Sequence, residues 1–346
     1  MHYSDYLQLD KILGAQNPES DQQQQPAHDE MLFIVIHQTY ELWFKQLLFE
    51  VNSVAEILTK PSLNDNSPLL QTIVHRLSRC ATIIKVLVHQ IDIMETMSAM
   101  DFLDFRDMLR PASGFQSWQF KLLEARLGLK FEQRHGQNYY TSQLRQPEID
   151  LIKAAEKEKS LLQWVNSWLE RMPFFEETEN WKNFHLSAGL SPEPGSHLFW
   201  TEYRWRYGQS LADAEKLNLQ SFDSFFLDSS PEGQRSLSPA ACRAALFILL
   251  YRGYPILQLP FQLLHQLLDI DEQLSTWRYR HMNMVHRMIG TRTGTGGSTG
   301  GDYLKGAVDQ HHIFLEIARL SSFLMERKRL PFLSREMEIR LGFIPR

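Results

Sequence analysis

Apolar side chains recur every three or four residues along most of this chain. Within residues 28–58, for example, Leu32, Ile36, Leu47 and Val51 fall on one face of a helical projection. This spacing is typical of an amphipathic helix that buries one face. Alternation of apolar and polar residues with a period of two is nearly absent, so no β-strand is expected. The pattern predicts a mostly α fold, built as a helical bundle.

The same periodicity predicts further helices. In chain order they are expected at residues 3–14, 66–98, 102–109, 115–128, 148–170, 239–269, 272–289 and 303–326. The polar, glutamine-rich residues 15–27 predict a loop. Pro111 and Gly114 predict the end of the short helical segment 102–109, because neither residue continues a helix well.

The stretch from about 172 to 237 differs from the rest in being rich in proline and aromatic side chains. We interpret it as a small helical insertion packed on the main bundle. The chain contains no internal repeat. Residues 1–346 are therefore expected to form a single domain that carries this insertion.

The composition is that of an ordinary globular protein. Of the 346 residues, 43% are hydrophobic and 22% are charged, so a sizeable core can form. The net charge of −5 and the absence of a long basic run argue against a nucleic-acid partner.

The two cysteines, Cys80 and Cys242, form no CxxC pair, which disfavours a disulfide framework or a cysteine-based zinc site and suits a reducing compartment. The first residues lack the basic and apolar regions of a secretory signal. No apolar run approaches the roughly 18 residues that a membrane span needs. We therefore expect a cytoplasmic protein that makes no membrane contact.

His37 is the first candidate functional residue. It interrupts an otherwise apolar helical face, which it shares with Phe33 and Glu41, four residues before and after it. A neutral imidazole there could ligate iron or make a hydrogen bond to a ligand. It could equally be a core histidine whose hydrogen bonds are satisfied within the protein. The spacing alone leaves both interpretations open.

His281 is the second candidate, at the end of the cluster WRYRH. His286 and the pair His311–His312 are rival ligands. Arginines at 278, 280 and 287 could hold the carboxylates or propionates of a ligand, or they could cover a solvated helix face. One buried imidazole and a second one near a polar loop would suit a haem pocket with a proximal ligand and a distal polar group.

Arg106 lies on one helical face between Phe102 and Leu109. A guanidinium in that setting could grip a carboxylate with two hydrogen bonds. The alternative is a surface arginine paired with Asp104 or Asp107, both of which are close to it in sequence.

A run of glycines and hydroxyl residues occupies residues 290–301 (GTRTGTGGSTGG). It matches neither GxGxxG nor GxxxxGK, so it indicates no dinucleotide or P-loop site. Glycines permit close backbone approach, and Thr293, Thr295, Ser298 and Thr299 supply hydroxyls. The run could fold over a small polar ligand or serve as a linker. No GxSxG or HExxH motif points to other chemistry.

Taken together and in this order, these features resemble the tryptophan 2,3-dioxygenase family. The resemblance covers roughly the first 130 residues and the region from about 240 to 326. The matching segments are YSDYLQLDKILGAQ (3–16), HDEMLFIVIHQTYELWFKQLLFEV (28–51), FRDMLRPASGFQSWQF (105–120) and RYRHMNMVHRMIGTRTGTGGSTGGDYL (278–304).

The resemblance implies a mostly helical haem b protein. It also implies a homotetramer in which N-terminal segments reach into neighbouring active sites. The implied reaction inserts both atoms of O2 across the indole C2–C3 bond of L-tryptophan and gives N-formylkynurenine, the first step of tryptophan degradation by the kynurenine pathway. A haem enzyme that inserts one oxygen atom or uses another indole, and a sensor without turnover, are the alternatives.

The resemblance also assigns roles to individual residues. His281 matches the proximal haem ligand, and His37 matches the distal histidine that hydrogen-bonds the indole N–H. Phe33 and Leu109 match apolar contacts to the indole, and Arg106 matches the arginine that binds the substrate carboxylate.

Five further positions match pocket residues of the family. Thr295 matches a loop threonine that binds the amino-acid end of the substrate, and Ser113 matches a serine near the haem. Tyr3 and Tyr6 match N-terminal tyrosines that complete the pocket of another subunit. Phe102 stands where some members carry tyrosine, so it offers no phenolic hydrogen bond. The lack of this hydrogen bond would weaken substrate binding by about 1 kcal/mol.

Overall fold

The computed structural model describes residues 1–60, 63, 67–192, 196–227, 235–292, 294 and 300–342, with the backbone alone at 138–139 and 300–303. Throughout these ranges the regular elements are α-helices and short 3₁₀ helices, and no strand occurs among them. The prediction of a mostly α fold is confirmed. None of the helices in the described ranges combines the length and the apolarity that crossing a membrane requires.

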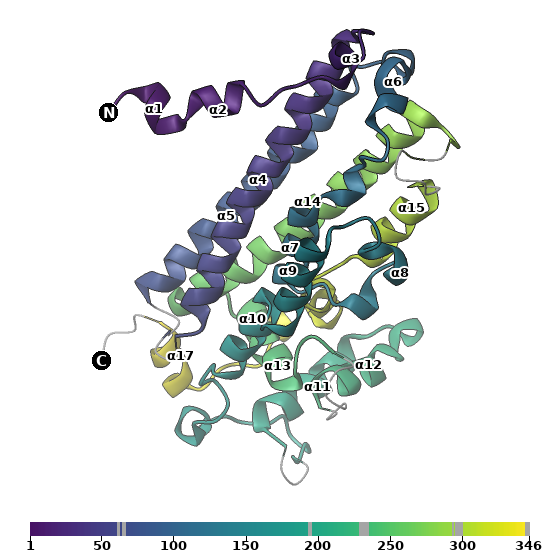
Figure 1. The fold of residues 1–346 in the computed structure, drawn as a ribbon. Coiled ribbons are helices and arrows are strands. Elements are labelled where there is room, and N and C mark those ends of the chain that lie inside the picture. The colour runs from purple at the N-terminus through teal and green to yellow at the C-terminus, as the bar shows by residue number, and fades with distance from the viewer. Residues whose placement is uncertain are drawn as a thin grey trace. The chain divides into compact units, whose positions relative to one another are not determined.

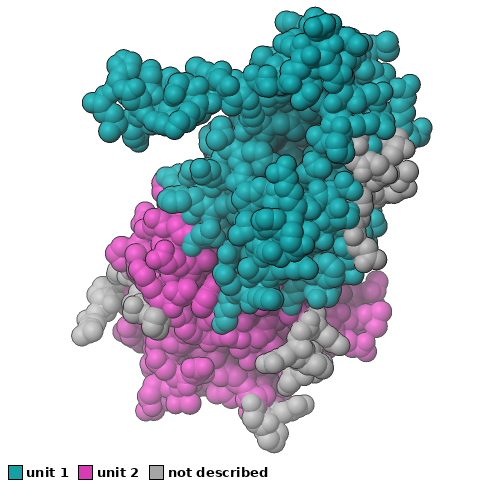
Figure 2. Space-filling model, in the orientation of Figure 1, with its two compact units in different colours: residues 1–52, 79–160, 270–313 teal, residues 53–78, 161–269, 314–346 magenta. Residues whose placement is uncertain are grey.

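The chain forms two compact units, which Figure 2 colours separately. Unit 1 comprises residues 1–52, 79–160 and 270–313. Unit 2 comprises residues 53–78, 161–269 and 314–346. The aromatic stretch 172–237 belongs wholly to unit 2. Its interpretation as an insertion in a single domain stays a prediction.

Three long helices provide the frame of unit 1: α4 (His28–Leu58), α5 (Pro68–Met94) and α14 (Gln258–Ile289). Their segments in this unit run side by side (Figure 1). The Tyr40 hydroxyl donates to the Leu87 carbonyl at 2.9 Å and so ties α4 to α5. Arg280 of α14 makes ion pairs of 2.7 and 3.0 Å with two carboxylates near the end of α5.

Shorter elements complete unit 1. Helix α6 begins at a capping box, in which Ser98 and Asp101 satisfy each other's backbone amides. Helices α7 and α9 pack against each other. Helices α1 and α2 extend away from α4 (Figure 1). The bounds are α1 (Tyr3–Leu7), α2 (Leu9–Leu13), α3 (Glu19–Gln22), α6 (Ala99–Arg106), η1 (Asp107–Leu109), η2 (Gly114–Gln116), α7 (Trp118–Leu127), η3 (Phe131–Gln133), α8 (Gln137–Tyr140), α9 (Gln146–Lys157) and α15 (Gly300–Gln310).

Unit 2 has a core of packed aromatic rings. Phe247 of α13 lies 4.9 Å from Phe174, centroid to centroid, and Phe222 lies 4.7 Å from Phe226. The Tyr203 hydroxyl donates to the Phe323 carbonyl at 2.7 Å. The bounds are α10 (Leu161–Glu170), η4 (Thr178–Trp181), α11 (Leu198–Ser210), η5 (Asp213–Glu215), α12 (Asn218–Phe226), α13 (Pro239–Leu250), η6 (Pro255–Leu257), α16 (Leu315–Arg319), η7 (Leu320–Phe323), η8 (Arg327–Arg329) and α17 (Arg335–Leu341).

Several predicted helix boundaries are wrong. The helix expected at 148–170 is two helices, α9 and α10, because the backbone at Glu158 is extended. The break expected after residue 269 falls instead at residues 251–257, where Pro255 opens η6. Helix α14 continues through the acidic residue Asp271, which is buried and accepts a hydrogen bond from the Ile313 amide at 3.0 Å. The Ile313 amide therefore stabilises Asp271 inside the helix, at a position where the sequence pattern predicted a break between two helices.

Candidate active site

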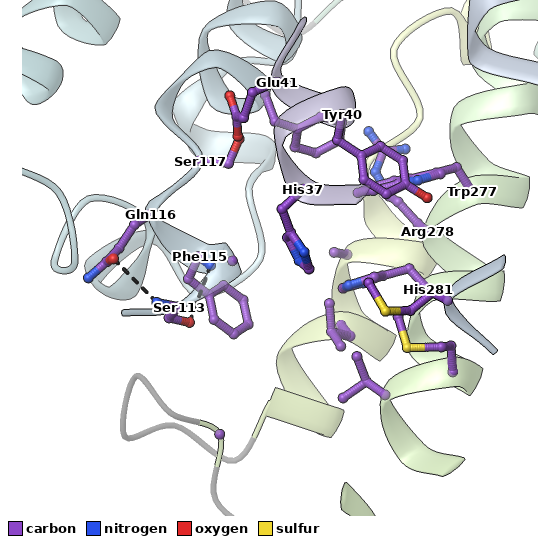
Figure 3. Close-up of a pocket in the computed structure, with 18 of the residues that line it drawn as sticks. His37, Tyr40, Glu41, Ser113, Phe115, Gln116, Ser117, Trp277, Arg278 and His281 are labelled. Atoms are coloured by element: carbon purple, nitrogen blue, oxygen red, sulfur yellow. Dashed lines mark hydrogen bonds between the residues drawn. The ribbon is translucent and has the colours of Figure 1, made fainter. Parts of the chain in front are cut away.

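Unit 1 encloses a cavity of about 760 Å³, within the size range of small-molecule sites. Its walls come from α4, α5, α6, α7, α14 and α15, and from the segment 109–117. Figure 3 shows His37 and His281 pointing into it from two different helices, α4 and α14. Seven of the ten expected site residues line this cavity: Phe33, His37, Phe102, Arg106, Leu109, Ser113 and His281.

The ring of His37 has one defined tautomer. Its Nδ1 lies 2.7 Å from the carbonyl oxygen of Phe33, one turn earlier on α4. Because a carbonyl oxygen can only accept, Nδ1 carries the proton, and Nε2 is left as an acceptor. Burial lowers the pKa of His37 below its ordinary value, against the opposing effects of the Phe33 carbonyl and the Glu41 charge. His37 is therefore a neutral imidazole at neutral pH.

His281 is also neutral. Burial, and then the nearby His37, lower the pKa of His281 to about 4. Its ring is stacked on that of Trp277, with centroids 5.3 Å apart and planes 9° apart. A neutral imidazole held in one orientation on an apolar wall is a suitable axial ligand for iron.

The rival histidines are held differently in unit 1, although His311 also lines the cavity. His286 is exposed and does not line the cavity. His311 accepts a hydrogen bond from the His135 amide at 3.1 Å. The Nδ1 atom of His312 lies 3.4 Å from the hydroxyl oxygen of Ser275. Of the candidate ligands, His281 is the one whose ring is directed into the cavity without such a partner in the described residues.

One end of the cavity is apolar and aromatic. The Phe33 ring lies 4.1 Å from the His37 ring and 5.7 Å from the Phe102 ring, which is stacked on it. Leu109 packs with this group, because residues 102, 106 and 109 share one side of α6 and η1. Such walls suit a flat bicyclic ring.

Arg106 brings a positive charge to this apolar end. The residue is 5% exposed, and its Nη1 lies 3.9 Å from Asp107 Oδ1, whose side chain is 79% exposed. The expected alternative of a surface position for Arg106 is therefore wrong, although Asp107 lies within ion-pair distance as that alternative supposed. A buried guanidinium on a cavity wall is suited to binding a carboxylate.

The segment after η1 presents hydroxyl groups to the cavity. Ser113 caps η2, since its Oγ accepts from the Phe115 amide at 3.3 Å (Figure 3). Ser117 also lines the cavity, and its buried hydroxyl has no partner among the described residues. Ser117 carries no signal in the sequence that separates it from other serines.

Three charged residues near the cavity were not foreseen in this role. Lys121 and Glu124 of α7 line it, although both are buried. Burial lowers the pKa of Lys121 to about 8, and its ammonium group donates to the Phe115 carbonyl. Arg278 binds Glu124 rather than facing solvent. Charged side chains in an amphipathic helix are usually exposed, so the sequence pattern alone indicates no such role.

Two residues with expected roles lie outside this cavity, and a third falls outside the described residues. Tyr3 and Tyr6 of α1 are 70% and 71% exposed and do not line it. Thr295 falls outside the described residues, between Gly294, which lines the cavity, and α15. The structure therefore brings together seven of the ten expected site residues.

Comparisons with known proteins identify the family of this chain. A sequence profile described as tryptophan 2,3-dioxygenase matches residues 1–324 and so includes the middle region, where the sequence by itself was less informative. The chain is similar to the tryptophan 2,3-dioxygenase of Bdellovibrio bacteriovorus, with 41% identity over 99% of this chain and 98% of that protein.

Two further relatives bear the same name. The protein of Alteromonas mediterranea is 42% identical over 99% of this chain and 97% of its own length. The protein of Xenopus tropicalis is 42% identical over 96% of this chain and 84% of its own length. A profile match over nearly the whole chain and identities above 40% show that this chain belongs to the tryptophan 2,3-dioxygenase family.

Proposed function

We propose that this protein is a haem-dependent dioxygenase that cleaves the indole C2–C3 bond of L-tryptophan. Both atoms of O2 enter the substrate, and the product is N-formylkynurenine. Membership of the family supports the reaction class. The observation that carries the proposal is the pair of neutral imidazoles, His37 and His281, that face one cavity beside a buried arginine.

The residues present fit haem b. His281 would hold the haem iron through its neutral imidazole, and the cavity wall is apolar there, with Met94, Met284 and Met288 among the lining residues. The unpartnered hydroxyl of Ser117, together with Ser113, offers polar contacts on another wall. When bound, haem would supply the iron chemistry by which O2 reacts, while the protein supplies orientation and electrostatics.

His37 would orient the indole ring. With Nδ1 bonded to the Phe33 carbonyl, Nε2 is the acceptor that an indole N–H requires. The Phe33 ring, 4.1 Å from the imidazole, would contact the face of the same indole together with Leu109. Holding the ring in one orientation lowers the entropic part of the barrier.

Arg106 would bind the carboxylate of the amino acid. Its guanidinium is buried at the apolar end, where a charge-assisted hydrogen bond is stronger than in water. Thr295 is proposed to contact the same end of the substrate. Phe102 lines the cavity without a hydroxyl group, so the substrate carboxylate depends more heavily on Arg106.

The N-terminal helices are proposed to complete the active site of a neighbouring subunit in a cytoplasmic homotetramer. Helix α1 has no buried residue in its own chain, and its two tyrosines are exposed. Exposed aromatic side chains on a projecting segment are suited to a contact with another chain. Tyr3 and Tyr6 would close the neighbour's pocket over the substrate.

The test is turnover by the haem-loaded, reduced protein mixed with L-tryptophan in isotopically labelled O2. Product of N-formylkynurenine mass with two labelled atoms is expected. One labelled atom would instead indicate a monooxygenase. A haem-bound protein that consumes no tryptophan would indicate a sensor and contradict the proposal.

A further inference from the structure

A buried carboxylate on α7 forms part of the wall of the candidate active site. Glu124 is 3% exposed and lines the cavity. Its Oε2 accepts from Arg134 Nη1 at 2.7 Å, and its Oε1 accepts from Arg278 Nη2 at 2.7 Å. Both arginines are themselves buried. The three residues therefore form a charge cluster that is shielded from solvent.

His311 adds a third partner to this carboxylate. Its Nε2 accepts a hydrogen bond from the His135 amide at 3.1 Å, so the ring proton is on Nδ1. That Nδ1 lies 3.5 Å from Glu124 Oε1. Burial acts to raise the pKa of the Glu124 carboxyl, but His311 and the two arginines outweigh it and hold the pKa well below its usual range. Glu124 is therefore ionised at neutral pH.

The cluster is close to two walls of the cavity. Arg278 precedes His281 by three residues on α14, which places the two about one helical turn apart. His311 directly follows α15, whose residues Leu304 and Ala307 line the cavity. Arg278 Nη1 also donates to the His311 carbonyl at 2.9 Å, so α14 and the end of α15 are bonded to each other as well as to Glu124.

Helix α15 rests directly on the segment that carries His135. A Cβ atom added at Gly306 would collide with the His135 ring, so a larger residue there would require that ring to move. The His135 amide is the group that orients His311. The contact of Gly306 with the His135 ring and the hydrogen bond from the His135 amide to His311 therefore both fix the C-terminal part of α15.

We propose that Glu124 is a positioning residue that fixes α14, with His281, relative to the α15 wall of the active site. Its single ionised carboxylate binds both Arg278 of α14 and His311 at the end of α15. Its relevance to catalysis rests on the proposed function, whereas the mechanical coupling can be measured without turnover.

The test compares three variants. Glu124→Gln keeps the shape and removes the charge, and Glu124→Asp keeps the charge on a shorter side chain. Glu202→Gln is the matched control, because Glu202 of unit 2 is also fully buried and binds Ser187 and Arg206. Amide hydrogen exchange is measured in the haem-free proteins over residues 274–281 and 304–311. Haem affinity is measured by Soret titration, and kcat and KM are measured on the loaded enzymes.

Glu124→Gln is expected to speed exchange by about tenfold or more in both segments, the effect of losing a charged hydrogen bond. It should also weaken haem binding and lower kcat more than it raises KM. Glu124→Asp should restore part of each effect, and Glu202→Gln should leave both segments unchanged. If Glu124→Gln does not fold, His311→Gln and Glu124→Asp are measured in its place, with faster exchange expected over 304–311.

Unchanged exchange in the Glu124 and His311 variants would overturn the proposal. So would equal effects of Glu124→Gln and Glu202→Gln, because these would indicate general destabilisation. The two proposals can fail separately. If the variants change amide exchange as expected but the wild-type protein shows no turnover, the proposed function is contradicted and the positioning role of Glu124 still holds.

Discussion

The imidazole of His281 lies parallel to the indole of Trp277, with ring centroids 5.3 Å apart and planes 9° apart. The two residues are four positions apart on α14, so one helical turn stacks one ring over the other. Tyr40, Phe44 and Phe120 pack around Trp277 in turn. The aromatic cluster restricts rotation of the imidazole and keeps it directed into the cavity.

We predict that His281→Ala abolishes stable haem binding while the protein remains folded. The axial ligand is lost, and the remaining apolar contacts cannot orient the iron. Soret absorbance after reconstitution measures the haem content, and circular dichroism measures folding. His286→Ala is the matched control, because His286 is an exposed histidine on the same helix. Full haem content in the His281 variant would refute the ligand assignment.

We predict that His37→Ala lowers kcat/KM for L-tryptophan by about three- to tenfold, the value of one hydrogen bond. The matched comparison uses N1-methyltryptophan, which has no N–H to donate. If Nε2 accepts the indole N–H, the variant should lose most of the preference for the unmethylated substrate. A variant that keeps the full preference would show that another group binds this N–H.

Arg106→Leu is predicted to raise KM for L-tryptophan by about 10- to 100-fold, which corresponds to loss of a charge-assisted hydrogen bond. Steady-state kinetics on tryptamine supplies the control, because tryptamine lacks the carboxylate. Its KM should change little. A similar rise for both substrates would assign Arg106 a structural role in the cavity wall.

Deletion of residues 1–8 is predicted to lower activity by about tenfold or more without changing the melting temperature. Helix α1 buries nothing in its own chain, so its removal costs the fold little. The full-length Tyr3→Ala/Tyr6→Ala double variant should reproduce the loss if these two side chains complete a neighbour's site. Unchanged kinetics in either protein would contradict the sharing of active sites between subunits.

Acid is predicted to destabilise unit 2 through His197, the N-cap of α11. Burial, and then Arg243, lower the pKa of this imidazole to about 4, and its Nδ1 accepts from the Phe199 amide at 3.1 Å. The unfolded chain takes up the proton near pH 6.5, and the folded chain does so only near pH 4. The free energy of unfolding therefore falls as the pH drops through this window.

His197 is expected to lower the free energy of unfolding by about 1–2 kcal/mol across this pH window, after allowance for solvent screening. His197→Asn keeps an N-cap acceptor and cannot titrate, so its unfolding free energy should depend less steeply on pH. Urea unfolding at several pH values between 4 and 6.5 measures the difference. Equal slopes in the two proteins would show that His197 is not responsible.

Much of the fold follows from local pattern. The prediction of a helix from about residue 28 to 58 is confirmed by α4, because a long apolar stripe leaves no competing structure. The errors occur where the local signal is weak. The expected break after residue 269 is absent, since the buried Asp271 is stabilised by the Ile313 amide, 42 residues away. A contact so distant along the chain leaves no trace in local periodicity.

The sequence by itself determined the helical class, the family segments and the identity of His37, Arg106 and His281 as candidates. Residue type, spacing and order along the chain carry that information directly. Only the tertiary structure decided that Arg106 is buried, that His37 has its proton on Nδ1, and that His286 faces solvent. Burial and protonation depend on what surrounds a side chain, and the surroundings are assembled from distant segments.

Glu124 illustrates that division most clearly. In the sequence it is one glutamate in an amphipathic helix, where exposure is the ordinary expectation. In the fold it is buried against Arg278, 154 residues further along the chain. The free-energy cost of burying this carboxylate is offset because the fold brings Arg134, Arg278 and His311 to it from other parts of the chain.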